Sequence, residues 1–147
     1  MPTTALPLST GAGRPLRTFL WIAQVLLAAV FIMAGVMKFF TPIVQLSIQI
    51  PWTSQVPELF VRFIGLVDLA GGLGVLLPAL TRIAPRLTPL AALGATVLQV
   101  LAISFHAYRG EFSVLPLNFV LLPLALFILW GRTKKAPIAP RAARHAA

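Results

Sequence analysis

The ionisable side chains of this sequence that lie within long apolar segments are few, and their types suit proton exchange and hydrogen bonding. Asp68 lies in the middle of one such segment, and His106 lies near the end of another. Carboxylates and imidazoles are the groups that most often act as general acids and bases. We therefore predict Asp68 and His106 as candidate acid–base residues, with Lys38, Arg62 and Asn118 as candidate ligand-binding residues.

Four apolar segments must position these side chains. The chain has 147 residues, of which 59% are hydrophobic and 10% charged, a composition outside the range of soluble domains. A helix crosses a hydrocarbon core of roughly 30 Å with about 20 apolar residues. The sequence therefore predicts an all-α integral membrane four-helix bundle, in one domain. The predicted spans are residues 18–40, 58–80, 87–108 and 114–131.

The basic residues indicate how the spans are oriented. All but Lys38, Arg62 and Arg109 of the twelve Lys and Arg residues lie in 1–17, in the turn around Arg82 or in 132–147. We predict 1–17 as a disordered N-terminal tail and 132–147 as a basic disordered C-terminal tail. By the positive-inside rule, both termini are expected to be cytoplasmic, in a multi-pass protein of the cell's inner membrane. Topology accounts for the net charge of +9, so the lipid bilayer is the expected partner and nucleic acid is not.

Counting along the helices gives each polar residue a depth. Lys38 and His106 lie near the ends of their spans, and Arg62 and Asn118 lie about one turn into theirs. All four spans thus contribute a polar side chain at one level, which predicts a polar pocket toward the outer leaflet. Asp68 lies roughly 15 Å deep by the helical rise. A carboxylate at such a position costs about 2.5–3.5 kcal/mol to insert, so Asp68 is expected to face the bundle and to find a partner.

Simpler explanations exist for the same residues. Lys38 and Arg62 can extend to the headgroups, and Glu58 with Arg62, four residues apart, can form an ordinary pair on the helix surface. The glycines between residues 65 and 74 indicate close packing of helices.

The segment 41–57 has apolar residues that fit both the two-residue period of a strand and one face of a helix. An isolated strand would leave backbone groups unpaired beside lipid. A short helix lying in the membrane interface is therefore favoured.

Three stretches of the sequence resemble a known family. They are FIMAGVMKFF (31–40), VRFIGLVDLAGGLGVLLPALTRIAPRLTPLAALG (61–94) and FHAYRGE (105–111), followed by an Asn in the last span. Together they resemble the DoxX-like family, the DoxX/DoxD type of four-helix membrane proteins, over about residues 31–132. In that family Glu is more readily expected where this chain has Asp68, which shortens the reach of the carboxylate by one methylene. The resemblance implies polar site positions at Lys38, Arg62, Asp68, His106, Glu111 and Asn118, and thus adds Glu111 to the ligand-binding candidates.

The resemblance also implies a function, because the family is named after a subunit associated with a thiosulfate:quinone oxidoreductase. The chain is accordingly expected to be a membrane subunit or accessory of a quinone-linked oxidoreductase system, with a quinone or lipid-like ligand in its pocket. The sequence has no cysteine and one intramembrane histidine, so it lacks the ligands of an Fe–S cluster or a bis-His haem. We expect no cofactor and no metal in the chain itself, and electrons would come from partner oxidoreductase subunits.

Other classes of function stay open. A stand-alone membrane enzyme, or a binding protein for a small apolar or lipid-like molecule, would use Asp68 or His106. A non-catalytic scaffold would pack further helices through Gly65, Gly71 and Gly74. A transporter with four spans would require a homo-oligomer. A stoichiometric protein partner that co-purifies in mild detergent favours a redox subunit or a scaffold. A bound lipid or quinone without a protein partner favours the stand-alone enzyme or binding protein.

The orientation can be tested with reporter fusions placed after Arg17, Arg82 and Arg132. All three are expected to report a cytoplasmic position, because each follows a basic segment. A periplasmic signal from any one of them contradicts the four-span topology.

Overall fold

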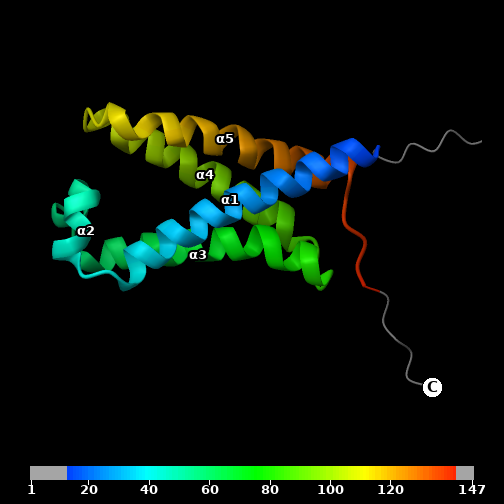
Figure 1. Ribbon diagram of the computed structural model, residues 1–147, viewed down its shortest axis with the longest axis horizontal. Coiled ribbons are helices and arrows are strands. Elements are labelled where there is room, and N and C mark those ends of the chain that lie inside the picture. The colour runs from blue at the N-terminus through cyan, green and yellow to red at the C-terminus, as the bar shows by residue number, and fades with distance from the viewer. Residues whose placement is uncertain (1–12, 142–147) are drawn as a thin grey trace, which may run out of the picture.

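The computed structural model describes residues 13–141, and its long elements are four helices (Figure 1). Each of the four is long and apolar enough to cross a membrane, and large apolar side chains are exposed along all of them. Helices suit this setting because they satisfy every backbone group within the segment. The predicted all-α membrane bundle is therefore confirmed. The four helices are α1 (Arg14–Phe40), α3 (Glu58–Thr81), α4 (Leu87–Tyr108) and α5 (Leu115–Trp130).

Short helical elements connect and extend the long ones. The segment 41–57 forms α2 (Ile43–Gln49) and the 3₁₀ turn η1 (Pro51–Ser54), so the helical interpretation of this segment holds and the strand alternative does not. A 3₁₀ turn, η2 (Phe112–Val114), precedes α5, and a π-helical turn, η3 (Gly131–Lys135), follows it.

Two helix limits differ from those predicted. Helix α1 begins at Arg14, so residues 14–17, predicted as part of a disordered tail, form its first turn. Pro15 is compatible with this position because the first turn of a helix leaves its N–H groups unpaired in any case. At the other terminus the helical backbone continues through η3 to Lys135, past the predicted start of the C-terminal tail at 132. Residues 136–141 of the predicted C-terminal tail are described and follow η3 without helix or strand, whereas residues 1–12 and 142–147 of the predicted tails lie outside the described residues.

The helices form a bundle in which α1 packs most extensively on α3, and α4 packs on α5 (Figure 1). Contacts of α3 with α4, and of α1 with α5, close the bundle. One end, here called the α2 end, holds α2 and the loops joining α1 to α3 and α4 to α5 (Figure 1). The start of α1 and the end of α5 lie together at the opposite end, here called the terminal end (Figure 1).

Glycines allow α1 and α3 to approach closely. A Cβ atom added at Gly35 of α1 would lie 2.8 Å from the backbone oxygen of Gly65 and 2.8 Å from the backbone nitrogen of Leu69. One added at Gly72 would lie 3.0 Å from the backbone oxygen of Ala28. The backbones therefore touch along much of this interface, as is common where small residues meet in membrane bundles.

A small apolar cluster closes the α2 end. Leu46 of α2, Trp52 of η1 and Val61 of α3 are buried together, and Met37 and Phe105 pack against them. The rings of Trp52 and Phe105 meet edge to face, with centroids 5.6 Å apart. The segment 41–57 is thus fixed between the end of α1, the start of α3 and the end of α4.

The close approach of α1 and α3 predicts that Gly35→Ala lowers the melting temperature of the purified protein in mild detergent. The new methyl group would meet backbone atoms of α3 that cannot move aside as a flexible side chain does. Gly94→Ala is the matched control, since a Cβ atom there has nothing within 4 Å, and the control is expected to melt no lower than the wild type. Equal melting temperatures for the two variants would contradict the packing described here.

Candidate functional site

An ion pair joins α1 and α3 within the bundle. Lys38 Nζ lies 2.7 Å from Asp68 Oδ2, and the two side chains are 15% and 8% exposed. The aliphatic part of Lys38 lies over Gly65, where an added Cβ atom would come within 2.9 Å of the Lys38 Cβ. Asp68 follows Gly65 by about one helical turn. The absence of a side chain at residue 65 therefore lets Lys38 reach deeper into the bundle and contact the carboxylate.

The Lys38–Asp68 pair lies inside the bundle, so the electrostatic interaction between its two charges is strong. A charge in a low-dielectric interior interacts strongly with a partner, and it is costly when the partner is removed. Ionisable residues inside membrane spans are rare and commonly mark proton or substrate sites. The pair can hold a proton at Asp68 or release it while keeping Lys38 nearby.

Arg62 serves the end of α1 rather than a cavity. Its Nη1 donates to the backbone oxygens of Lys38 at 2.8 Å and Thr41 at 2.7 Å, which the helix leaves without intrahelical partners. Its Nε and Nη2 donate to Glu58 Oε1 at 3.1 and 2.7 Å. The surface pair with Glu58 is thus formed, and the same guanidinium also ties α3 to α1.

A second polar cluster lies where α4 ends. His106 Nδ1 is 2.7 Å from Glu111 Oε2, and Arg109 Nε donates to Glu111 Oε1 at 2.8 Å. Arg109 Nη2 also donates to Gln55 Oε1 at 2.7 Å, and its guanidinium carbon lies 5.2 Å from the Phe105 ring centroid. These contacts bind the α4–η2 turn to the segment 41–57.

The carboxylate of Glu111 organises this second cluster. Its hydrogen bond from Arg109, with a further one at His106, holds the pKa of Glu111 below its ordinary value. An ionised carboxylate at Nδ1 orients the imidazole and leaves its other nitrogen to exchange a proton. Glu111 therefore fixes the position of the His106 ring beside the turn.

The predicted residues separate into different sets of contacts. Lys38 pairs with Asp68, His106 with Glu111, and Asn118 donates only to the backbone oxygen of Val114 in its own helix, at 3.3 Å. Neither of the two cavities described below is lined by any of the predicted site residues.

Sequence reasoning gave no role to Arg109 and Gln55, which complete the second cluster. Arg109 lies between His106 and Glu111 in the turn, a spacing that signals a local cluster. Gln55 has no comparable signal, because its contact depends on how the segment 41–57 folds.

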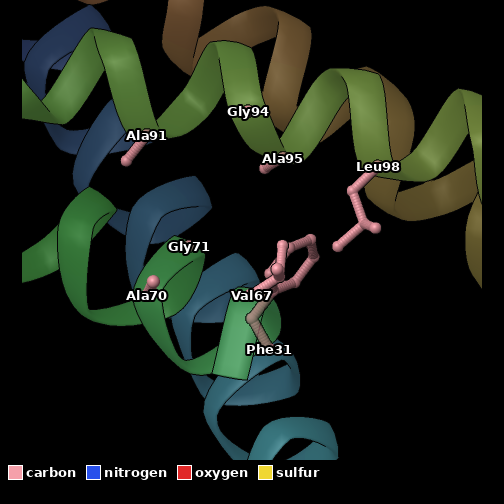
Figure 2. A pocket seen from close by; sticks show the side chains of 8 residues that line it. All are labelled: Phe31, Val67, Ala70, Gly71, Ala91, Gly94, Ala95 and Leu98. Atoms are coloured by element: carbon pink, nitrogen blue, oxygen red, sulfur yellow. The ribbon is translucent and has the colours of Figure 1, made fainter. Parts of the chain in front are cut away.

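An apolar cleft of about 220 Å³ lies between α3 and α4 (Figure 2). Its lining includes Val67 and Ala70, which flank Asp68 in the sequence of α3. Phe31 and Leu98 point into it, and small residues form much of its remaining wall (Figure 2). Ala70 and Gly94 in that wall are exposed, so the cleft opens on the side of the bundle. The full lining is Phe31, Val67, Ala70, Gly71, Ala91, Gly94, Ala95 and Leu98.

Within residues 13–141, no three His, Cys, Asp or Glu side chains are grouped as a metal site would require. Fold and contacts together define a multi-pass α-helical membrane protein with an ion pair buried between α1 and α3. The family model of the DoxX-like family matches residues 22–128. The chain therefore belongs to the DoxX-like family. Comparisons with curated proteins and with solved structures give no match.

The ion pair predicts a non-additive double-mutant cycle. Lys38→Met is expected to lower the free energy of unfolding by about 3 kcal/mol, because it leaves a buried carboxylate without its partner. Asp68→Leu is expected to cost less, because the freed Lys38 can extend toward the headgroups. The double variant, which leaves no buried charge at either position, should recover most of the loss.

Glu58→Gln is the matched control for carboxylate removal, since its surface pair should contribute less than about 1 kcal/mol. Chemical unfolding of all variants in the same detergent measures the cycle. Strictly additive effects of Lys38→Met and Asp68→Leu, or a stabilised Asp68→Leu single variant, would refute the pair.

Proposed function

We propose that this chain is a membrane subunit or accessory protein of a quinone-linked oxidoreductase system, in the inner membrane with both termini cytoplasmic. We further propose that it binds the quinone, or a molecule with a similar apolar chain, in the cleft between α3 and α4. The apolar lining of that cleft is the observation that carries the binding proposal. The redox assignment rests on the resemblance of residues 31–132 to a family named after a quinone oxidoreductase subunit.

The shape of the cleft supports an elongated apolar ligand. Alanines and glycines line both helices, so the two backbones border much of the groove between them. Phe31 and Leu98 supply flat apolar contact at one part of it (Figure 2). Ligand sites for apolar molecules are typically concave, mostly apolar and served by few polar groups.

Gln99 is a buried polar residue of α4 that lies outside the lining of the cleft. It follows Leu98 on α4, is 5% exposed, and its Oε1 has no hydrogen-bond partner among the described residues. A buried acceptor left unpaired costs about 1–3 kcal/mol. Because Gln99 does not line the cleft, the proposed ligand's contacts there are apolar.

In this proposal the acid–base candidates Asp68 and His106 exchange protons but do not line the cleft. Asp68 lies between the cleft residues Val67 and Ala70 along α3, so it shares their depth while its carboxylate faces Lys38. His106, held by Glu111, lies nearer the α2 end. Both can exchange protons, and electrons would come from a partner subunit, because the sequence supplies neither the cysteines of an Fe–S cluster nor the two intramembrane histidines of a bis-His haem.

The glycines on which a scaffold function would depend already have partners in this chain. Gly65 packs against Lys38 and Phe39, Gly71 against Phe31, and Gly74 against Ala91. This use of the glycines favours a binding function over a scaffold that receives other helices at these positions.

The proposal predicts that quinone co-purifies with the wild-type chain and that Gly94→Leu removes it. Leucine at residue 94 would occupy the cleft without a backbone clash, since a Cβ atom there lies in open space. Organic extraction of the detergent-purified protein, followed by mass spectrometry, measures quinone per chain. We expect a loss of roughly tenfold or more, the change that follows from about 1.4 kcal/mol of lost binding.

Leu93→Phe is the control, because Leu93 is exposed on the same helix outside the cleft lining. It should retain the wild-type quinone content. Equal quinone content in all three proteins, or none in the wild type, contradicts the binding proposal. A partner protein that co-purifies without quinone would instead favour the scaffold.

A further inference from the structure

Three arginines line a cavity of about 320 Å³ at the terminal end of the bundle. Arg17 comes from the start of α1, Arg82 from the residue that ends α3, and Arg132 from η3. Trp21 and residues 136–139 form further parts of the wall. This cavity lies on the other end of the protein from both polar clusters described above.

Arg132 is held in a fixed position although it carries a charge. It is 5% exposed, its Nε donates to Gln24 Oε1 at 2.7 Å, and its guanidinium carbon lies 5.3 Å from the Trp21 ring centroid. Its Nη1 makes a longer contact of 3.3 Å with the backbone oxygen of Ala136. Its Nη2 is buried and has no hydrogen-bond partner among the described residues.

The hydrogen bond to Gln24 holds the Arg132 guanidinium in place, so the group does not rotate to give its Nη2 a partner. Gln24 is fully buried in α1, and its Nε2 donates to the backbone oxygen of Val75 in α3 at 2.8 Å. Its amide oxygen is thereby directed to Arg132. The contact joins α1, α3 and η3, while Arg132 Nη2 stays without a hydrogen-bond partner among the described residues.

Within residues 13–141, no acidic side chain lies at this end. Every ion pair found within residues 13–141 lies toward the α2 half, and all three acids of the chain, Glu58, Asp68 and Glu111, take part in those pairs. A buried guanidinium without an opposite charge is costly. Two further arginines on the same cavity add repulsion, which an anion would relieve.

The C-terminal segment completes the wall beside Arg82. Arg82 Nε donates to the backbone oxygen of Ala139 at 3.2 Å, and the Arg82 carbonyl accepts from the backbone N–H of Arg141 at 3.0 Å. Figure 1 shows this segment leaving η3 and passing toward the end of α3. The cavity is thus bounded by helix ends and by the C-terminal segment, which is hydrogen-bonded to Arg82 in the cavity wall.

We infer that this cavity binds a phosphate group, as presented by the headgroup of an anionic phospholipid. The planar guanidinium offers donors in a geometry that matches phosphate oxygens. The cavity lies at the ends of membrane-spanning helices, where lipid phosphates are concentrated, and basic pockets between such helices bind anionic headgroups. Its volume is at the lower end of the range for ligand sites. Free inorganic phosphate offers the same chemistry and is the other source of the anion.

The test follows the melting temperature of the full chain in mild detergent as dioleoyl phosphatidylglycerol is added, with dioleoyl phosphatidylcholine as the uncharged comparison. The anionic lipid is expected to raise the melting temperature saturably and the uncharged lipid is not. A parallel titration uses sodium phosphate against sodium chloride at equal ionic strength. A rise with phosphatidylglycerol alone assigns the site to lipid, and an equal rise with phosphate assigns it to the free ion.

Two matched pairs of variants distinguish anion binding in the cavity from a general attraction of anions to the basic surface. Arg17→Gln and Arg82→Gln remove lining arginines, whereas Arg14→Gln and Arg86→Gln remove exposed arginines from the same α1 turn and the same loop. The lining variants should require roughly tenfold more anion for half of the effect, because each loses a hydrogen bond to a charged group. The controls should behave as the wild type.

These variants leave the Arg132–Gln24 contact intact, so they preserve the packing of α1 on η3. Absence of a saturable rise with either anion overturns the inference. Equal weakening by lining and control variants also overturns it, because that result would mean a diffuse attraction of the basic surface.

Discussion

A carboxylate within hydrocarbon must either find a partner inside the protein or lose its charge, and this requirement governs the packing of α1 on α3. Lys38 reaches Asp68 because Gly65 offers no side chain in its path. Gly35 and Gly72 extend the same close contact along the interface. Arg62 then ties the end of α1 to α3 through backbone oxygens. The charge, the glycines and the helix end are thus parts of one arrangement.

The two ends of the bundle differ in whether their charged side chains have partners of opposite charge. At the α2 end every acid has a basic partner, and the cluster around Glu111 fastens the α4–η2 turn to Gln55. At the terminal end, Arg132 is buried against Gln24 without any acid. The first end is internally balanced, whereas the second is left with excess positive charge.

Much of the fold follows from the sequence because the bilayer restricts the possibilities. Segments of about 20 apolar residues must be helices, so the four spans and their order can be predicted. The expectation that Asp68 faces the bundle and finds a partner also agrees with its burial and its contact with Lys38. Helix limits at Arg14 and Lys135 were less predictable, since backbone hydrogen bonding continues past the end of an apolar stretch.

The contacts of the candidate site were harder to predict. Depth along a helix places Lys38 and His106 at one level, but it does not fix how neighbouring helices are rotated about their axes. That rotation decides that Lys38 meets Asp68, whereas His106 and Glu111 are five residues apart in one turn and meet locally. Gln24 and Arg132 are 108 residues apart, and only the packing of α1 against the end of α5 brings them together. Sequence reasoning therefore named most of the polar residues and left their pairing open.

The ion pair can be observed directly, because Asp68 is the only aspartate of the chain and the lysines are Lys38, Lys134 and Lys135. Solid-state NMR of the protein in lipid, with ¹³C at the aspartate Cγ and ¹⁵N at the lysine Nζ, measures the dipolar coupling between the two atoms. The single carboxyl signal is expected to show strong coupling at a separation consistent with the 2.7 Å contact of Nζ with Oδ2. Lys38→Met should abolish that coupling. A carboxyl signal without coupling to any lysine nitrogen in the wild-type protein would contradict the account, since Asp68 would then face the bundle without Lys38.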